Sequence, residues 1–251
     1  MNARLLPVLA LAACFAPEPL PECRVVSTSD FAKRTPYVAR LERKAATSDC
    51  TERQRLSSML IGAEQYRDGE ETRVLLRPGR LVDIAQGRVF SSDGRPVPRT
   101  DASDPKQRKL DAIFTLPRKP SGAVCLATGS ATAEQRFDEV TVTQADGGST
   151  TFPAYPARLQ FSPLQVSAFP PGAAFFSEVV QTEGTCTASY ELLAIHPAVA
   201  CTRDEDCAGP NPDAGRLNGS GLDPGFKATC DLDAGYCMAN FAVLLGRLPT
   251  F

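Results

Sequence analysis

Short apolar runs, separated by residues that favour turns, make up most of the chain between Arg24 and Val199. The runs are rich in Val, Leu, Thr and Phe, and Gly, Pro, Asp and Ser stand between them, as is typical of antiparallel all-β proteins. The pattern therefore predicts an all-β body, either an antiparallel β-sandwich or a barrel-like sheet. The expected strands are residues 37–43, 58–65, 72–76, 122–128, 139–144, 157–162, 175–181 and 185–195.

Turn and helix signals complete this outline. The clearest hairpin joins the last two strands through residues 182–184, and the Ala-Asp-Gly-Gly stretch at 145–148 predicts a second turn. One short helix is expected over residues 106–112, because Ser103-Asp104-Pro105 offers a cap and a proline at the first helical position. Residues 51–61 fit a helix or a strand, and the polar residues 91–103 are expected to form a surface loop.

Charge and histidine content exclude several functions. The chain of 251 residues has 27 Lys and Arg against 29 Asp and Glu, so no electrostatic argument favours nucleic-acid binding. A Ser/His/Asp or Cys/His centre needs an imidazole, and His196 is the only histidine. It precedes Pro197 at the end of an apolar run, where a structural role is expected. We therefore predict no catalytic residue, no cofactor and no enzymatic activity.

The N-terminus predicts export. Arg4 is followed by an uncharged, mostly apolar run up to Ala13, which is typical of a signal peptide over residues 1–13 and too short to span a bilayer. Residues 14–22 hold three prolines and predict an extended tether. Leu11-Ala12-Ala13-Cys14 resembles the lipobox of bacterial lipoproteins. That resemblance implies that Cys14 becomes acylated and binds membrane lipid, and Phe15 favours the outer membrane over retention in the inner one.

Cysteine number supports export. Nine cysteines are awkward in an oxidising compartment, but acylation of Cys14 leaves eight, enough for four disulfides. We expect Cys23 to pair with Cys50 and Cys125 with Cys186, although spacing alone does not fix connectivity. The remaining four, Cys201, Cys207, Cys230 and Cys237, are expected to pair among themselves.

These cysteines divide the exported part of the chain into a β-rich domain (23–199), a Cys-rich module (200–240) and a C-terminal segment (241–251).

Zinc would need reduced thiols, so disulfides are the better expectation. Asp231 and Asp233 begin like a calcium loop, but Gly235 stands where a third ligand is expected. They are weak calcium candidates, because a turn between two cysteines explains the same residues. Residues 201–240 are acidic (seven acids, three bases), whereas residues 31–60 are basic (seven bases, three acids).

The Cys-rich module carries a family resemblance. Cys201-Thr-Arg-Asp-Glu-Asp-Cys207, with Cys230 and Cys237 after it, resembles modules of exported myxobacterial proteins. Together with the lipobox, it resembles the Cys-rich outer-membrane lipoproteins that include the adventurous gliding motility group. The resemblance implies a lipid-anchored, non-enzymatic structural or interaction protein whose partners are other envelope proteins. Two alternatives stay open: a β lipoprotein that carries a lipid or glycan, and an envelope hydrolase that uses carboxylate pairs such as Asp204 and Asp206.

Overall fold

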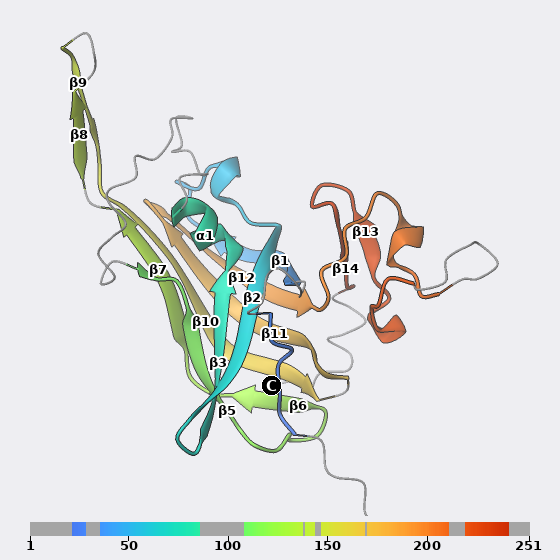
Figure 1. Ribbon diagram of the computed structural model, residues 1–251. Helices are drawn as coiled ribbons and strands as arrows, with labels where there is room; N and C mark the ends of the chain where they lie inside the picture. The colour runs from blue at the N-terminus through green and yellow to red at the C-terminus, as the bar shows by residue number, and fades with distance from the viewer. Residues whose placement is uncertain are drawn as a thin grey trace, which may run out of the picture.

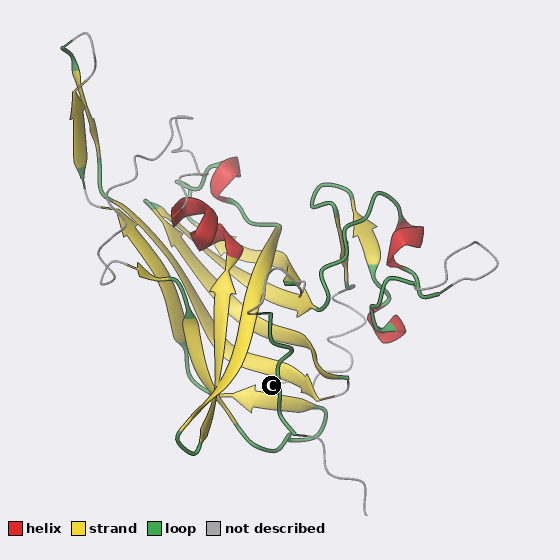
Figure 2. Cartoon of the chain, viewed as in Figure 1, coloured by secondary structure: helices red, strands yellow, loops and turns green. Residues whose placement is uncertain are grey.

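An antiparallel sheet of ten strands forms the body of the protein, as Figures 1 and 2 show. The computed structural model describes residues 22–28, 36–85, 108–137, 139–143, 147–168, 170–210 and 219–240. The all-β prediction is confirmed. The strands of the sheet are β1 (Tyr37–Ala46), β2 (Ser58–Asp68), β3 (Glu71–Pro78), β4 (Arg108–Lys109), β5 (Ala112–Leu116), β6 (Val124–Ala127), β7 (Ala131–Phe137), β10 (Tyr155–Ala168), β11 (Pro171–Glu183) and β12 (Cys186–Ile195).

The sheet curls into a nearly closed barrel. Its order is β4-β7-β10-β11-β12-β1-β2-β3-β5, with β6 paired to β10 beside β7. Only Leu110 and Asp111 separate β4 from β5. One short segment therefore pairs with β7 at one end of the row and with β3 at the other end. β5 also contacts β6 and β7, so a barrel describes the body better than a sandwich.

Side chains fill the interior of the barrel. Successive residues of a strand point to opposite faces, so every second residue of β11 and β12 faces inward. The inward positions carry aromatic and branched side chains that pack into one cluster across the sheet. The largest of those that are fully buried are Tyr37, Tyr190, Phe161, Phe175, Ile61, Leu76, Leu159, Leu164 and Leu192.

Different segments cover the two mouths of the barrel. Helix α1 (Gly79–Ala85) follows β3 and places Leu81 and Ile84 in the core at the mouth where β11 ends and β12 begins. We call this the α1 mouth. Residues 22–28 lie toward the opposite mouth, where Thr28 makes hydrogen bonds to the main chain of Ala63. The Thr28 N–H donates to the Ala63 carbonyl, and the Ala63 N–H donates to Thr28 Oγ1, each at 2.6 Å.

The Cys-rich module packs on the outer face of the barrel. It contains the 3-10 turns η3 (Asp204–Cys207) and η5 (Pro224–Phe226) and the short strands β13 (Thr229–Asp231) and β14 (Tyr236–Met238). Phe226 and Met238 pack against Val38, Leu193 and Ile195, which point outward from β1 and β12. This contact explains why the C-terminal end of β12 is buried on both faces.

The four disulfides differ in part from the expected pairing. Cys201–Cys230 and Cys207–Cys237 close the module within itself, as expected. In the barrel, however, the bonds are Cys23–Cys125 and Cys50–Cys186, so the expected pairs were wrong. The reason is topological. Cys23 lies in the segment beside β6, the strand that contains Cys125. Cys50 follows β1, the neighbour of β12, and lies next to Cys186, the first residue of β12.

All eight expected strands exist, but the sequence patterns missed others. The unpredicted strands are β4, β5, β7, β9 (Ser149–Phe152), β13 and β14, and α1 was not predicted either. The helix expected over residues 106–112 is wrong where the structure describes it. Arg108 and Lys109 form β4, and Ala112 begins β5. The β11–β12 turn is Gly184-Thr185 rather than 182–184, and residues 51–61 form η1 (Glu52–Gln54) followed by the start of β2.

One hairpin stands apart from the barrel. β8 (Val140–Thr143) pairs only with β9, and the two extend beyond the ends of β7 and β10 in Figure 1. The expected loop at 91–103, the predicted signal peptide and residues 14–21 of the tether, Cys14 included, lie outside the described residues.

Candidate functional site

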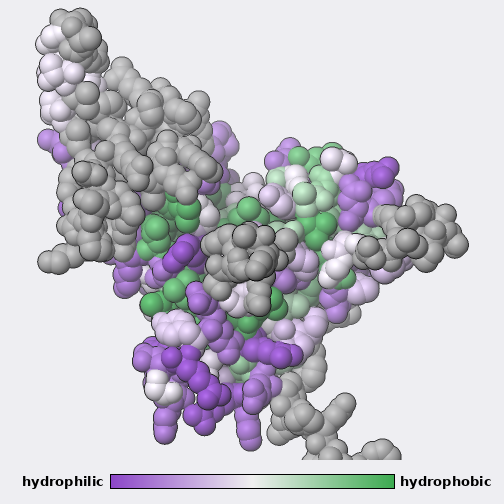
Figure 3. Space-filling model, viewed as in Figure 1, coloured by the Kyte–Doolittle hydropathy of each residue, from purple (hydrophilic) through white to green (hydrophobic). Residues whose placement is uncertain are grey.

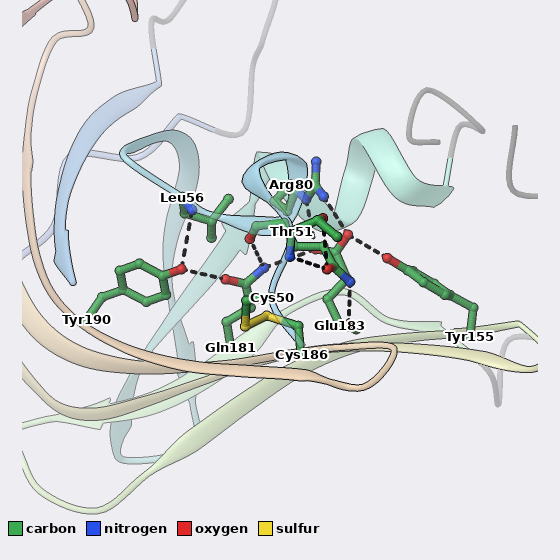
Figure 4. A network of polar contacts seen from close by, with 10 residues as sticks. Cys50, Thr51, Leu56, Arg80, Tyr155, Gln181, Glu183, Cys186 and Tyr190 are labelled. Carbon is green, nitrogen blue, oxygen red and sulfur yellow. Dashed lines mark hydrogen bonds and ion pairs between the residues drawn. A yellow bond between two sulfur atoms is a disulfide. The ribbon is translucent and has the colours of Figure 1, made fainter. Parts of the chain in front are cut away.

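Glu183 is the centre of a buried polar cluster at the α1 mouth (Figure 4). It ends β11 on an inward position and is 1% exposed. Its Oε1 accepts hydrogen bonds from Arg80 Nη2 and, at 2.7 Å, from the Tyr155 hydroxyl. Its Oε2 accepts from Arg80 Nε and Gln181 Nε2, each at 3.0 Å. Each carboxylate oxygen thus has two donors, which uses the acceptor capacity of an ionised carboxylate.

Two glutamines and a tyrosine extend the cluster across the mouth. The Gln181 amide donates to the main-chain carbonyl of Gln54 at 2.8 Å and accepts from the Tyr190 hydroxyl at 3.0 Å. The same hydroxyl accepts from the main-chain N–H of Leu56 at 3.3 Å. The Gln54 side chain donates to the main-chain carbonyl of Glu183 at 2.8 Å. Side chains and backbone from η1, β11 and β12 therefore form one continuous network.

The Cys50–Cys186 disulfide fixes η1 over this network. Cys50 directly precedes Thr51, whose N–H and hydroxyl both donate to Gln54 Oε1 at 3.0 Å. Cys186 begins β12, three residues after Glu183. The bond therefore holds Gln54 at the position from which it reaches both Glu183 and Gln181.

Burial keeps the Tyr155 phenol protonated. Desolvation is the main cause that raises the pKa of Tyr155 above its usual range, and the negative charge of Glu183 adds to it. A protonated hydroxyl can donate to the carboxylate, as the 2.7 Å contact requires. The Glu183 carboxylate is thus paired with the Arg80 guanidinium, and neutral hydrogen-bonding groups surround the pair.

The chemistry open to this cluster is limited. A general base needs a lone pair within reach of the proton that it removes. Both oxygens of Glu183 already accept two hydrogen bonds each, and the carboxylate does not reach solvent. The Arg80 guanidinium is engaged by the same carboxylate. The geometry therefore suits a rigid structural joint better than proton transfer.

Sequence reasoning did not single out Glu183 or Arg80. The available signal was in β11, where Gln181 and Glu183 occupy the same alternate positions as the buried Phe175 and Val179. A charged residue on the buried face of a strand implies a buried partner of opposite charge. The partner could not be found in this way, because α1 itself was not predicted.

His196 lies at the other end of β12 from this cluster. Its ring centroid is 5.1 Å from that of Tyr37, and its main-chain N–H donates to the Ala173 carbonyl at 2.9 Å. The Tyr37 hydroxyl donates to the Gly172 carbonyl and accepts from the Val26 N–H. The histidine therefore packs where residues 22–28 meet the barrel.

The acidic residues of the module stabilise turns. Asp231 Oδ1 accepts the N–H groups of Asp233 and Ala234 at 3.1 and 3.0 Å. Asp204 Oδ1 accepts the N–H of Cys230 at 2.8 Å. The sulfur atoms of Cys201, Cys207 and Cys237 lie close together, but each belongs to a disulfide and is not a free thiolate ligand.

Comparisons with known proteins identify the family. Residues 35–197 match the family model described as MlpA, a range that begins just before β1 and ends just after β12. The chain is 26% identical over 245 residues to "Putative lipoprotein MlpA" of Myxococcus xanthus, which covers 96% of this chain and 92% of that protein. No solved structure matches. Within the described part of the chain, no helix has the length and apolar character needed to cross a membrane. Because the family model covers the whole barrel, the chain belongs to the MlpA family.

Proposed function

We propose that the protein is a lipid-anchored, non-enzymatic structural or interaction component of the bacterial cell envelope. The observation that carries the anchor is Leu11-Ala12-Ala13-Cys14 directly after an apolar run. The name of the Myxococcus xanthus relative supports it, because the similarity extends over nearly the whole of both chains. Acylated Cys14 is the membrane attachment, and several acyl chains together hold a protein firmly on a bilayer.

The buried cluster supports a non-enzymatic role. The one constellation in the described residues that joins a carboxylate, a guanidinium and two tyrosines is saturated with internal hydrogen bonds. The barrel interior is filled by side chains, which disfavours the alternative of a ligand carried inside the barrel. Asp204 and Asp206, the pair considered for a hydrolase, both accept main-chain N–H groups within the module.

The anchor is tested by Cys14→Ala in cells fed an alkyne fatty acid. We expect the wild type to become labelled and to sediment with membranes, and the variant to lose both properties. Phe15→Asp is the control, since it keeps Cys14. On a density gradient, it should remain labelled and shift from the outer to the inner membrane. A Cys14→Ala protein that stays labelled would show that Cys14 is not the acylated residue.

The interaction role is tested by crosslinking in cells, followed by purification of the full-length protein. We expect defined envelope proteins to be captured, among them components of an outer-membrane motility assembly, and colony expansion to fall when the gene is deleted. Native mass spectrometry of the same preparation separates the alternatives. A bound lipid or glycan in place of a protein partner would favour a carrier, and turnover lost on Asp204→Asn would favour a hydrolase.

A further inference from the structure

The two disulfides of the Cys-rich module lie side by side. Cys201–Cys230 and Cys207–Cys237 each join the segment that contains η3 to the β13–β14 hairpin. The Sγ atoms of Cys201, Cys207 and Cys237 all lie within 4.8 Å of one another, although they belong to two different bonds. A thiolate released from one bond is therefore already next to the sulfur atoms of the other.

The backbone of the hairpin also fits a second pairing of these cysteines. Cys230 lies directly opposite Cys237 in the β13–β14 register. The Cys230 N–H donates to Asp204 Oδ1 and the Cys237 N–H donates to the Val199 carbonyl, so the two cysteines form a non-hydrogen-bonded pair. The Cα atoms of such a pair lie about 4.5 Å apart, within the range of about 4.4–6.8 Å that a disulfide spans. A Cys230–Cys237 bond therefore needs no movement of the two strands.

Cys230 is the cysteine of the module that an external thiol reaches first. It is partly exposed, whereas Cys201, Cys207 and Cys237 are buried. In Figure 3 the module forms a lobe beside the barrel, with hydrophilic residues on its outer surface. Because exchange requires access of the attacking thiolate to a sulfur atom, the reaction begins at Cys230.

We propose that the module is a thiol–disulfide exchange site for an external thiolate, such as that of a dithiol oxidoreductase. Exchange replaces the two cross-links by the local bonds Cys201–Cys207 and Cys230–Cys237. The external thiolate attacks Cys230, forms a mixed disulfide and expels the Cys201 thiolate. Cys201 attacks the neighbouring Cys207 and expels Cys237, which then attacks Cys230 and releases the external thiolate unchanged. As many sulfur–sulfur bonds form as break, so the exchange consumes no oxidant or reductant.

The exchange frees the hairpin from η3. The present disulfides join residues 29 and 30 apart, whereas the local bonds close the η3 segment and the hairpin each on itself. A disulfide constrains a chain more strongly when it closes a longer loop. With the local bonds, Phe226 and Met238 hold the hairpin on the barrel through packing alone. The reaction involves only described residues, so its test does not depend on the lipid anchor.

The test exposes the folded full-length protein to reduced glutathione at about pH 8, where part of the thiol is ionised. Acid and an alkylating agent stop the exchange, and a lysine-specific protease cuts the denatured, unreduced protein. Lys227, the last lysine of the chain, lies between Cys207 and Cys230, so the present cross-links keep residues 228–251 attached after cleavage. We expect glutathione to release this peptide with an internal Cys230–Cys237 bond. A peptide that stays attached, or that is released with both thiols free, would overturn the proposal.

Single variants provide a second measurement, without added thiol. Cys207→Ser leaves Cys237 as a free thiol opposite Cys230, so part of the 228–251 peptide should be released with the same internal bond. Cys186→Ser is the matched control, because it frees Cys50 at the α1 mouth, and the peptide should stay attached. Release from both variants, or from neither, would show that the neighbouring sulfur atoms of the module do not direct the exchange.

Discussion

The Arg80 guanidinium meets the Glu183 carboxylate through two parallel hydrogen bonds, although 103 residues separate the two along the chain. Arg80 belongs to α1, and Glu183 ends β11. The pair therefore attaches the helix to the barrel wall at the mouth that the helix covers. Removal of one partner from a buried ion pair leaves an uncompensated charge, which costs more than the pair itself contributes.

Arg80→Ala should destabilise the protein by about 3 kcal/mol or more, because Glu183 would remain buried without its counter-charge. Urea unfolding measures this loss. Arg77→Ala is the matched control, since Arg77 makes a similar two-point contact with Asp111, but its side chain is 42% exposed. A partly exposed pair contributes about 1 kcal/mol or less. Equal losses in the two variants would contradict a structural role for the buried pair.

Stability should fall as the pH rises above about 10, the ordinary pKa of tyrosine. Burial and the Glu183 charge raise the pKa of Tyr155 in the folded protein, so the unfolded chain releases its proton at lower pH. The stability that the raised Tyr155 pKa contributes is therefore fully present below about pH 10, and it is lost as the pH rises toward the pKa of Tyr155 in the folded protein. Tyr155→Phe should flatten this part of the curve, measured by urea unfolding between pH 8 and pH 11 (about the usable alkaline range). An unchanged slope would exclude Tyr155 as the cause.

Gly172→Ala should cost about 3 kcal/mol, because it adds a steric clash to the strain of a left-handed backbone. Gly172 has φ +70, and a Cβ at this position would lie 2.5 Å from the carbonyl oxygen of Arg24. Gly69→Ala separates the two effects. Its φ is +61, but a Cβ there would meet no atom within 4 Å, so only the strain of about 1 kcal/mol applies. Thermal unfolding compares the two variants. Similar melting temperatures would show that residues 22–28 move away from the added Cβ at little cost.

His196→Gln should lower stability by about 1 kcal/mol and leave cellular function intact. The imidazole packs against the Tyr37 ring, and glutamine retains a polar group of similar size. A catalytic histidine would behave differently, since its loss reduces rate without unfolding the protein. The measurement is the melting temperature alongside a function assay in cells. A fully stable variant without function would reassign His196 to an active site.

Strand alternation made most of the barrel predictable. The pattern of residues 175–195 gave the β11–β12 hairpin because its apolar and polar positions alternate over two full strands. By contrast, Arg108, Lys109 and Ala112 belong to a run of helix formers. The strand conformation of Arg108 and Lys109 is imposed by pairing to β7, and that of Ala112 by pairing to β3. Local propensity does not contain that information, because the partners lie far along the chain.

The site was less predictable than the fold. Module disulfides form between cysteines 29 and 30 residues apart, so the expectation that they pair locally was correct. The barrel disulfides join residues 102 and 136 apart, and only the closed sheet brings these together. The Glu183 cluster has the same origin, since its members come from η1, α1, β10, β11 and β12.

The Cys23–Cys125 bond also determines how the molecule would respond to traction. If acylated Cys14 holds the protein to a membrane, the eight residues between Cys14 and Cys23 keep this bond within about 30 Å of the lipid. A pull on the anchor would then pass from Cys23 through sulfur to Cys125 in β6 and on to β10. The residues between the two cysteines, which include β1, β2 and β3, lie off that path and cannot be drawn out while the bond is intact. The barrel would therefore bear tension as one rigid body, without unfolding β1, β2 or β3.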